Sequence, residues 1–237
     1  GFGSISSFAT IPDNIAVKWP DNVPDAWCVS PPPDPIPVPM FKLCRLAFGR
    51  LWIANTKDDP GMLIPSLVGR YGTFQEGTQL FPDASGGEIT GLWAVDNGLL
   101  VFTRTSTYMI TVNDEGGGFR SSTLSPNIGC VAPSSIANLP DGATIWLGRE
   151  GFYKLSAEGF ELISLANNIE MQRINPLRAR QSCAAYDPTS KEYRCWVPLD
   201  ASTTNNTCFI YDGQAFRRRT SETAASVCVT KDHRNYM

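Results

Sequence analysis

The sequence has one histidine, His233, and no cysteine pair spaced as in a zinc site. Zinc sites usually need clustered cysteine and histidine ligands, so we expect no metal. A Ser-His-Asp triad would depend on that single histidine near the end of the sequence. The short motifs of α/β-hydrolases, P-loop proteins and zinc proteases are also missing. We therefore expect no catalytic residue, no cofactor and no enzymatic activity.

Long apolar runs and strong net charge are missing as well. No stretch approaches the roughly 18 apolar residues that a membrane-spanning helix needs. No basic segment followed by an apolar run opens the sequence, so we expect neither a membrane span nor a signal peptide in it. Charged residues make up 18% of the chain and the net charge is −3. This balance gives no electrostatic reason to expect nucleic acid as a general partner.

The sequence does contain seven cysteines, which is an odd number. We expect most of them to be buried free thiols that pack as small apolar side chains, which implies assembly in a reducing cytoplasm. Cys183, Cys195 and Cys208 fall near the middle of three successive predicted strands. Their spacing predicts three thiols side by side on one sheet face, either as a packed cluster or with a disulfide among them.

A repeated unit organises the chain and is clearest at residues 98–108 and 142–153. At an offset of 45 residues, Arg104 aligns with Arg149 and Tyr108 aligns with Tyr153. Each copy has a glycine turn, an apolar run, a polar turn with the arginine, and a second strand with the tyrosine. We interpret the recurring arginines and tyrosines as part of the architecture of the unit, since a 40–50-residue repeat of short strands is typical of a propeller blade.

The same unit recurs through most of the sequence. Aromatic residues mark the middle strands at Trp52, Phe102, Trp146 and Trp196, at spacings of 50, 44 and 50 residues. We predict an extended proline-rich strap over 1–40, where nine of the 18 prolines lie, and β-propeller blades over 41–237. The predicted blades cover 41–68, 86–124, 129–164 and 182–220, and a further strand begins at 225.

The predicted fold is therefore all-β: a propeller of short four-stranded blades, about four of them visible and part of a larger ring, with an extended arm before them. A β-sandwich is the alternative, because short alternating strands with turns every 8–12 residues suit it too. Between the predicted blades, residues 69–86 are expected to form a loop, and residues 165–180 are expected to form a short helix or an irregular crossing.

Few residues are candidates for a site. Paired carboxylates would suit a glycosidase, but turn formation accounts for the four candidate aspartates, Asp58, Asp59, Asp96 and Asp141. The main basic cluster is Arg217-Arg218-Arg219. These three side chains would contact phosphate or another subunit, or else lie solvated at a strand end.

Four stretches together resemble the β-propeller tail proteins of short-tailed bacteriophages, of the nozzle or tubular type. They lie within a span of about residues 44–220, and each motif is moderately specific. The stretches are Gly-Arg-Leu-Trp-Ile-Ala at 49–54 followed by Asp59-Pro60; Leu-Leu-Val-Phe at 99–102 with Ser106 and Tyr108; Gly-Cys-Val-Ala-Pro-Ser-Ser at 129–135 leading to Asp141-Gly142 and Gly-Arg-Glu-Gly-Phe-Tyr at 148–153; and Tyr186-Asp187 with Glu192-Tyr193 and Phe-Ile-Tyr-Asp at 209–212.

The resemblance implies a structural protein of the virion tail that is assembled in the host cytoplasm. Copies of the chain would form a ring around the channel through which the genome leaves. The partners it implies are other copies of the chain, tail proteins of the adaptor, fibre or spike kind, and genomic DNA in transient contact. The alternative from a different class is a carbohydrate-binding or glycan-hydrolysing β-propeller.

Overall fold

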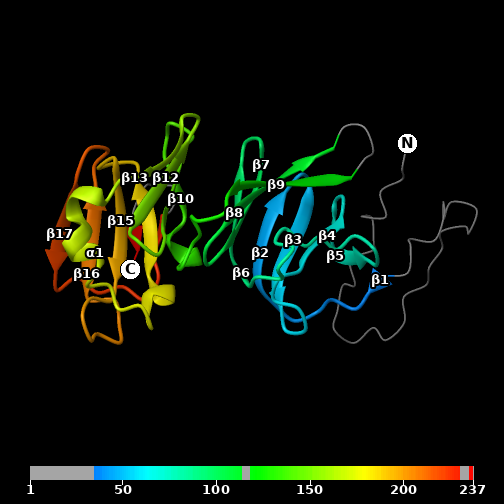
Figure 1. Cartoon of the computed structure of the whole chain (residues 1–237), viewed down its shortest axis with the longest axis horizontal. Coiled ribbons are helices and arrows are strands. Elements are labelled where there is room, and N and C mark those ends of the chain that lie inside the picture. Colours follow the sequence, from blue (N-terminus) through cyan, green and yellow to red (C-terminus); the bar gives the residue numbers. More distant parts are fainter. Residues whose placement is uncertain (1–34, 114–117, 230–234, 237) are drawn as a thin grey trace, which may run out of the picture. The chain divides into compact units, whose positions relative to one another are not determined.

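The computed structural model describes residues 35–113, 118–229 and 235–236 (Figure 1). The chain divides into residues 1–34 and a second unit, Pro35–Met237, which holds every described element. The described strands pair in antiparallel fashion into a five-stranded sheet, three four-stranded sheets and a two-stranded ribbon. The all-β class is therefore confirmed. The predicted strap lies outside the described residues up to position 34.

The first sheet is assembled from the beginning of the described chain. Its strands are β1 (Pro35–Ile36), β2 (Phe41–Ala47), β3 (Arg50–Thr56), β4 (Leu63–Leu67) and β5 (Arg70–Gln75), in the order β1-β5-β4-β3-β2. The end of the proline-rich region thus supplies the outer strand of this sheet.

The loop predicted for residues 69–86 is wrong in its first part, where β5 forms. Apolar residues do not alternate there, so the pattern gave no strand signal. Pairing with neighbours on both sides makes the segment a strand: Phe74 lies opposite Ser66 of β4 and Ile36 of β1. Tertiary context overrides a weak local pattern here.

The second sheet contains β6 (Ile89–Val95), β7 (Gly98–Thr103), β8 (Thr107–Val112) and β9 (Phe119–Ser125) in chain order. Val95 pairs with Gly98. The two-residue turn is therefore Asp96-Asn97, and the four strands of this sheet lie within the blade predicted for 86–124, apart from the last residue of β9.

The third sheet contains β10 (Ala137–Asn138), β11 (Thr144–Leu147), β12 (Phe152–Ser156) and β13 (Gly159–Leu162), and the short helix η2 (Pro133–Ser135) precedes it. Its central hairpin has the register of the second sheet at an offset of 45. Val101 pairs with Tyr108, as Trp146 pairs with Tyr153. The repeat seen in the sequence is thus a repeat in backbone pairing.

The segment between the third and fourth sheets, here called the crossing segment, covers residues 163–182. It contains three short helical turns, η3 (Leu165–Asn167), α1 (Asn168–Met171) and η4 (Ala179–Gln181), as the interrupted apolar pattern predicted. No helix in the described part of the chain is long and apolar enough to cross a membrane.

The fourth sheet contains β14 (Cys183–Asp187), β15 (Glu192–Val197), β16 (Thr207–Tyr211) and β17 (Phe216–Thr220) in chain order. A two-stranded ribbon follows. Its strands are β18 (Cys228–Val229) and β19 (Asn235–Tyr236).

The predicted row of three thiols in the fourth sheet is wrong. Trp196 pairs with Cys183 on one side and Cys208 on the other, whereas Cys195 pairs with Ala184 and Phe209. Since successive side chains of a strand point to opposite faces, the one-residue difference in register places Cys195 on the other face. All three cysteines are free thiols, so no disulfide joins them.

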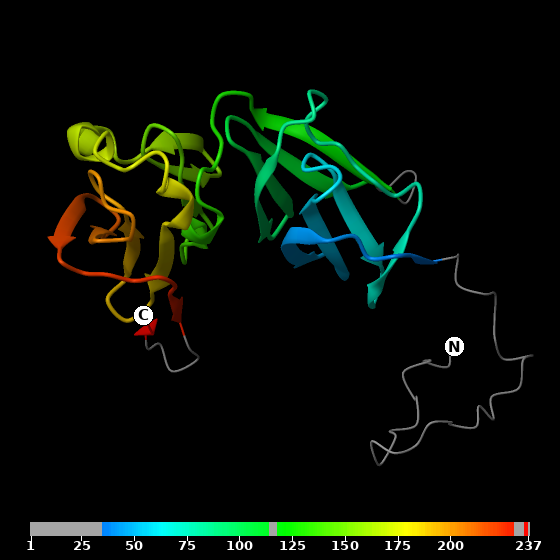
Figure 2. The same ribbon diagram turned by 90° about the horizontal axis from the view of Figure 1, so that it is seen from below.

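Successive sheets are packed against each other through apolar side chains on both faces. Val101 of the second sheet shares a buried cluster with Trp52 of the first, and Phe102, on the opposite face, shares one with Trp146 of the third. Leu147 of the third sheet faces Phe209 of the fourth in the same way. The second and third sheets therefore each pack against a neighbouring sheet on both faces. Figure 2 shows the ribbon of the four sheets from below.

The four aromatic markers do not share one orientation. Trp52 and Phe102 each face the sheet that follows in the chain, and Trp196 packs against residues that follow its own sheet. Trp146 instead faces the preceding sheet, and Leu147 occupies the orientation of the other three. The recurrence of the middle strand was predicted correctly, but the residue that marks it in the third sheet was not.

One edge strand of each sheet, namely β2, β6, β10 or β14, lies in a common row. β2 contacts β6, β6 contacts η2 at the start of the third sheet, and β10 contacts β14, which also contacts β18. Side chains link the row: the Arg45 guanidinium lies 3.8 Å from the centre of the Trp93 ring, and Trp93 Nε1 donates to Asn138 Oδ1 at 2.6 Å. Three sheets are therefore connected along these edge strands.

Candidate functional site

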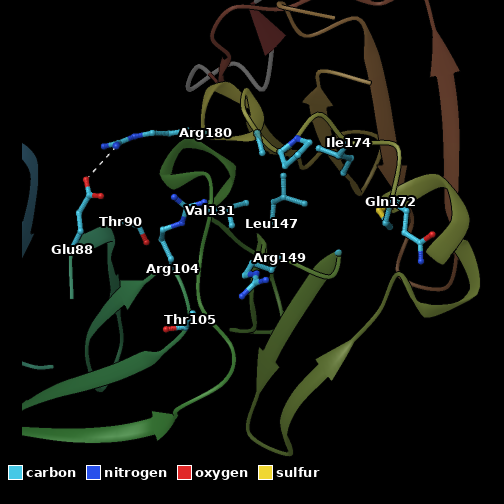
Figure 3. A pocket seen from close by; sticks show the side chains of 15 residues that line it. Glu88, Thr90, Arg104, Thr105, Val131, Leu147, Arg149, Gln172, Ile174 and Arg180 are labelled. Carbon is cyan, nitrogen blue, oxygen red and sulfur yellow. Dashed lines mark hydrogen bonds and ion pairs between the residues drawn. The ribbon is translucent and has the colours of Figure 1, made fainter. Parts of the chain in front are cut away.

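A cavity of about 630 Å³ lies where the second sheet, the third sheet and the crossing segment meet (Figure 3). Arg104, Arg149 and Arg180 line it, together with one carboxylate, Glu88. An apolar part of the lining is formed by Val131, Leu147, Met171 and Ile174. The cavity thus combines cationic side chains with an apolar surface.

Arg104 is held at the cavity by close backbone packing. It follows β7 in a turn whose Thr103 carbonyl accepts a hydrogen bond from the Cys130 N–H at 2.9 Å. A Cβ atom at Gly129 would overlap the backbone of this turn, so the approach requires glycine. Trp146 Nε1 donates to the Gly129 carbonyl at 3.1 Å, which fastens the turn to the third sheet.

Arg149 is held in the equivalent turn of the third sheet. The Gly148 N–H donates to the Gly151 carbonyl at 2.8 Å and closes the turn around it. Gly151 has a φ of +145°, and a Cβ atom there would overlap the hydroxyl of Ser164. The turn therefore depends on glycine, and it presents Arg149 from the same repeat position as Arg104.

Arg180 and Glu88 face each other across the cavity. Arg180 Nη1 lies 3.3 Å from Glu88 Oε1, and the Asn55 amide donates to the same oxygen at 2.8 Å. The hydrogen bond from Asn55, and then the charges of Arg180 and Lys42, hold the pKa of Glu88 below its usual value. Glu88 is therefore ionised at neutral pH and pairs with Arg180 rather than with the other two arginines.

Arg104 and Arg149 have no partner within the described residues: neither forms a hydrogen bond or an ion pair there. Both side chains also line a second, smaller cavity of about 220 Å³. The carboxylate of Glu150 borders that cavity and accepts a hydrogen bond from the Tyr153 hydroxyl at 3.1 Å. Burial, followed by this carboxylate, raises the pKa of Tyr153 to about 12.

The basic cluster predicted from sequence lies elsewhere, on the outer strand β17. Arg217 Nη2 lies 2.9 Å from Glu192 Oε1, Arg218 is paired with Glu170, and Arg219 is paired with Glu222 at 3.4 Å. Each of the three arginines thus has a carboxylate partner within its own chain. Contact of these residues with phosphate or with another subunit stays a prediction.

The aspartates attributed to turns occupy turns. Asp59 Oδ1 accepts the Gly61 N–H and Asp141 Oδ1 accepts the Ala143 N–H, each at 3.0 Å. Asp58 and Asp96 also lie at bends or turns. Within the ranges the structure describes, no three His, Cys, Asp or Glu side chains come together as a metal site would require.

Sequence reasoning noticed Arg104 and Arg149 but assigned them to the architecture of the unit. For the tyrosines this interpretation holds, because Tyr108 and Tyr153 are buried where successive sheets meet. For the arginines it is wrong: both are exposed and neither is paired with a described residue. Their recurrence at one offset was the only sequence signal that could have marked the cavity.

Comparison with known proteins identifies no family for the chain. No protein-family model matches the chain, and no curated protein matches its sequence.

Proposed function

We propose that the chain is a structural component of a bacteriophage tail, of the nozzle or hub type, which oligomerises around the DNA exit channel. In this proposal the four sheets are blades of a β-propeller. The observation that carries it is the packing of successive sheets face to face with one edge strand of each sheet in a row, because propeller blades are arranged in this way around an axis. The tail assignment itself rests on the sequence resemblance.

The far faces of the two end sheets are already buried in the single chain, so contact with neighbouring chains there rests on the proposal alone. Within the described residues, the far face of the first sheet, with Ile53 and Phe74, packs only against side chains of its own sheet and the turn before β4. The far face of the fourth sheet, around Trp196, packs against Ala224 and Val227. Trp196 Nε1 is buried there and has no acceptor among those residues.

A glycan-hydrolysing role has less support. Glycosidases of the common types use two carboxyl groups, one of which must be protonated to act as an acid. The larger cavity has a single carboxylate, Glu88, and the pKa of this group is lowered rather than raised. The cavity therefore lacks the pair that this chemistry requires.

Electron microscopy of the purified full chain, with analytical ultracentrifugation, tests the ring. We expect closed rings whose formation depends on concentration. Removal of residues 1–34 should weaken ring formation without unfolding the β-sheets, because every described strand lies after that point. A chain that stays monomeric at every concentration would contradict the ring, and a truncated chain that assembles as well as the full chain would contradict the role of the strap.

A further inference from the structure

Arg104 and Arg149 are the starting point, because they are charged groups held in place without a counter-charge of their own. Each lies in a turn fixed by glycine packing and backbone hydrogen bonds, not by an ion pair. Both line the same two cavities. Two like charges near one another raise the free energy of the site unless an anion lies between them.

The charge and the donors of the larger cavity favour a phosphate group over a carboxylate. Three guanidinium groups and one carboxylate line its wall, which leaves a net charge of +2. Two unpaired arginine forks offer more hydrogen-bond donors than the two oxygens of a carboxylate can accept. A phosphate group carries more charge and more acceptor oxygens, and planar guanidinium forks match it in pairs. Glu150 borders only the smaller cavity.

The size and the apolar lining point to a ligand larger than phosphate itself. A volume of about 630 Å³ falls within the range of small-molecule sites, about 300–1,000 Å³. Leu147 and Ile174 belong to the apolar part of the lining (Figure 3). This surface suits an apolar or flat organic part attached to the phosphate.

We infer that the cavity is a binding site for a phosphate ester, with Arg104 and Arg149 holding the phosphate group. Arg180 completes the wall and stays paired with Glu88. The phosphate belongs either to a small phosphorylated molecule or to a nucleic-acid backbone. The inference does not depend on ring formation, because every lining residue comes from one chain.

Calorimetric titration of the full chain tests the site. The probes are inorganic phosphate, a nucleoside 5′-monophosphate, a short single-stranded oligonucleotide, and acetate as the carboxylate control. We expect saturable binding of the phosphate probes that is tighter than binding of acetate. Mononucleotide as the tightest probe identifies a small ligand. Oligonucleotide as the tightest, with affinity falling steeply as salt rises, identifies a nucleic-acid backbone.

Variants assign the binding to the cavity. The double variant Arg104→Gln with Arg149→Gln should weaken binding about a hundredfold, since hydrogen bonds to charged groups contribute roughly tenfold or more each. Arg120→Gln is the matched control, because Arg120 is an exposed arginine of β9 away from the cavity. It should leave affinity unchanged.

Three results would overturn the inference: no saturable binding of any phosphate probe, acetate binding as tightly as phosphate, or an equal loss of affinity in the Arg120→Gln control. Thermal unfolding of all variants at one pH checks that they remain folded. A monomeric chain that binds phosphate would support this site while contradicting the proposed ring.

Discussion

Two groups of arginines in this chain are held in opposite ways. On β17, Arg217, Arg218 and Arg219 each have a carboxylate partner, so the strand is stabilised by charge pairing at its own surface. In the cavity, Arg104 and Arg149 have no partner among the described residues and are positioned by their backbone alone. The first group balances its charge within the chain, whereas the second leaves charge available for a ligand.

This difference shows what a run of arginines does and does not indicate. The run on β17 is conspicuous in the sequence, but its partners come from segments on either side of it and neutralise it. The two cavity arginines lie 45 residues apart in the sequence and become neighbours only when successive sheets pack. Unpaired charge in a cavity is the stronger indication of a binding site.

The largest effect is expected from Trp146→Ala, which removes the packing that positions the cavity arginines. Trp146 is fully buried, packs 5.0 Å from the Phe102 ring centre and donates to the Gly129 carbonyl. We expect a loss of about 3–5 kcal/mol in the free energy of unfolding and loss of phosphate binding. Denaturant unfolding and calorimetry measure the two effects.

Trp52→Ala is the matched control for that experiment. Trp52 is equally buried between the first and second sheets, but its Nε1 donates to the Ala47 carbonyl, away from the cavity. Trp52→Ala should lower the free energy of unfolding by a similar amount, while the folded protein keeps its affinity for phosphate. If Trp146→Ala does not fold, Trp146→Phe keeps a smaller aromatic ring in the core and removes the hydrogen bond to Gly129. Full phosphate affinity in both Trp146 variants would show that packing does not position the arginines.

A smaller loss of folding stability is expected at alkaline pH, and it comes from a buried thiol close to the cavity. Burial raises the pKa of Cys130, beside the Arg104 turn, from about 9 to about 12. Between these values the unfolded chain loses the thiol proton while the folded chain keeps it. The contribution of this thiol to stability is therefore present below pH 9 and is lost as the pH rises toward 12, at about 1.4 kcal/mol per pH unit.

Cys130→Ala tests this contribution through the slope of stability against pH. The variant should be less stable at neutral pH but should lose stability more slowly above pH 9, by about 1.4 kcal/mol per pH unit. Unfolding in denaturant at several pH values from neutral to alkaline gives both slopes. Parallel slopes for the variant and the original chain would show that this thiol already ionises in the folded state.

Much of the fold could be predicted because its signals are local. Phe48 and Gly49, for example, form a tight turn between β2 and β3, with φ angles of 54° and 65°. The 45-residue repeat reappears as identical register in the central hairpins of the second and third sheets. Strand register was predicted less well. The four-residue loop from Pro188 to Lys191 sets the pairing of β14 with β15. A one-residue error in that pairing was enough to predict Cys195 on the wrong face of the sheet.

The cavity could not be predicted in the same way, because three separate segments form it. Glu88 and Arg104 come from the second sheet, Arg149 from the third, and Arg180 from the crossing segment. No pattern within a short window brings these residues together. The recurrence of Arg104 and Arg149 was visible, but only the structure shows that the recurring side chains lack partners while the recurring tyrosines are buried.

The smallest loss of stability is expected from Glu170→Gln, which affects only the arginines that are paired with carboxylates. Glu170 of α1 pairs with Arg218 of β17 and with Arg173, which also pairs with Asp200 at 2.9 Å. Because these groups are partly exposed, we expect a loss of only about 0.5–1 kcal/mol in the free energy of unfolding, reduced further by salt. Arg104→Gln, measured by denaturant unfolding in parallel, should cost no stability because no partner is lost. A larger loss for Arg104→Gln than for Glu170→Gln would reverse the assignment of which arginines stabilise the fold and which remain free to bind.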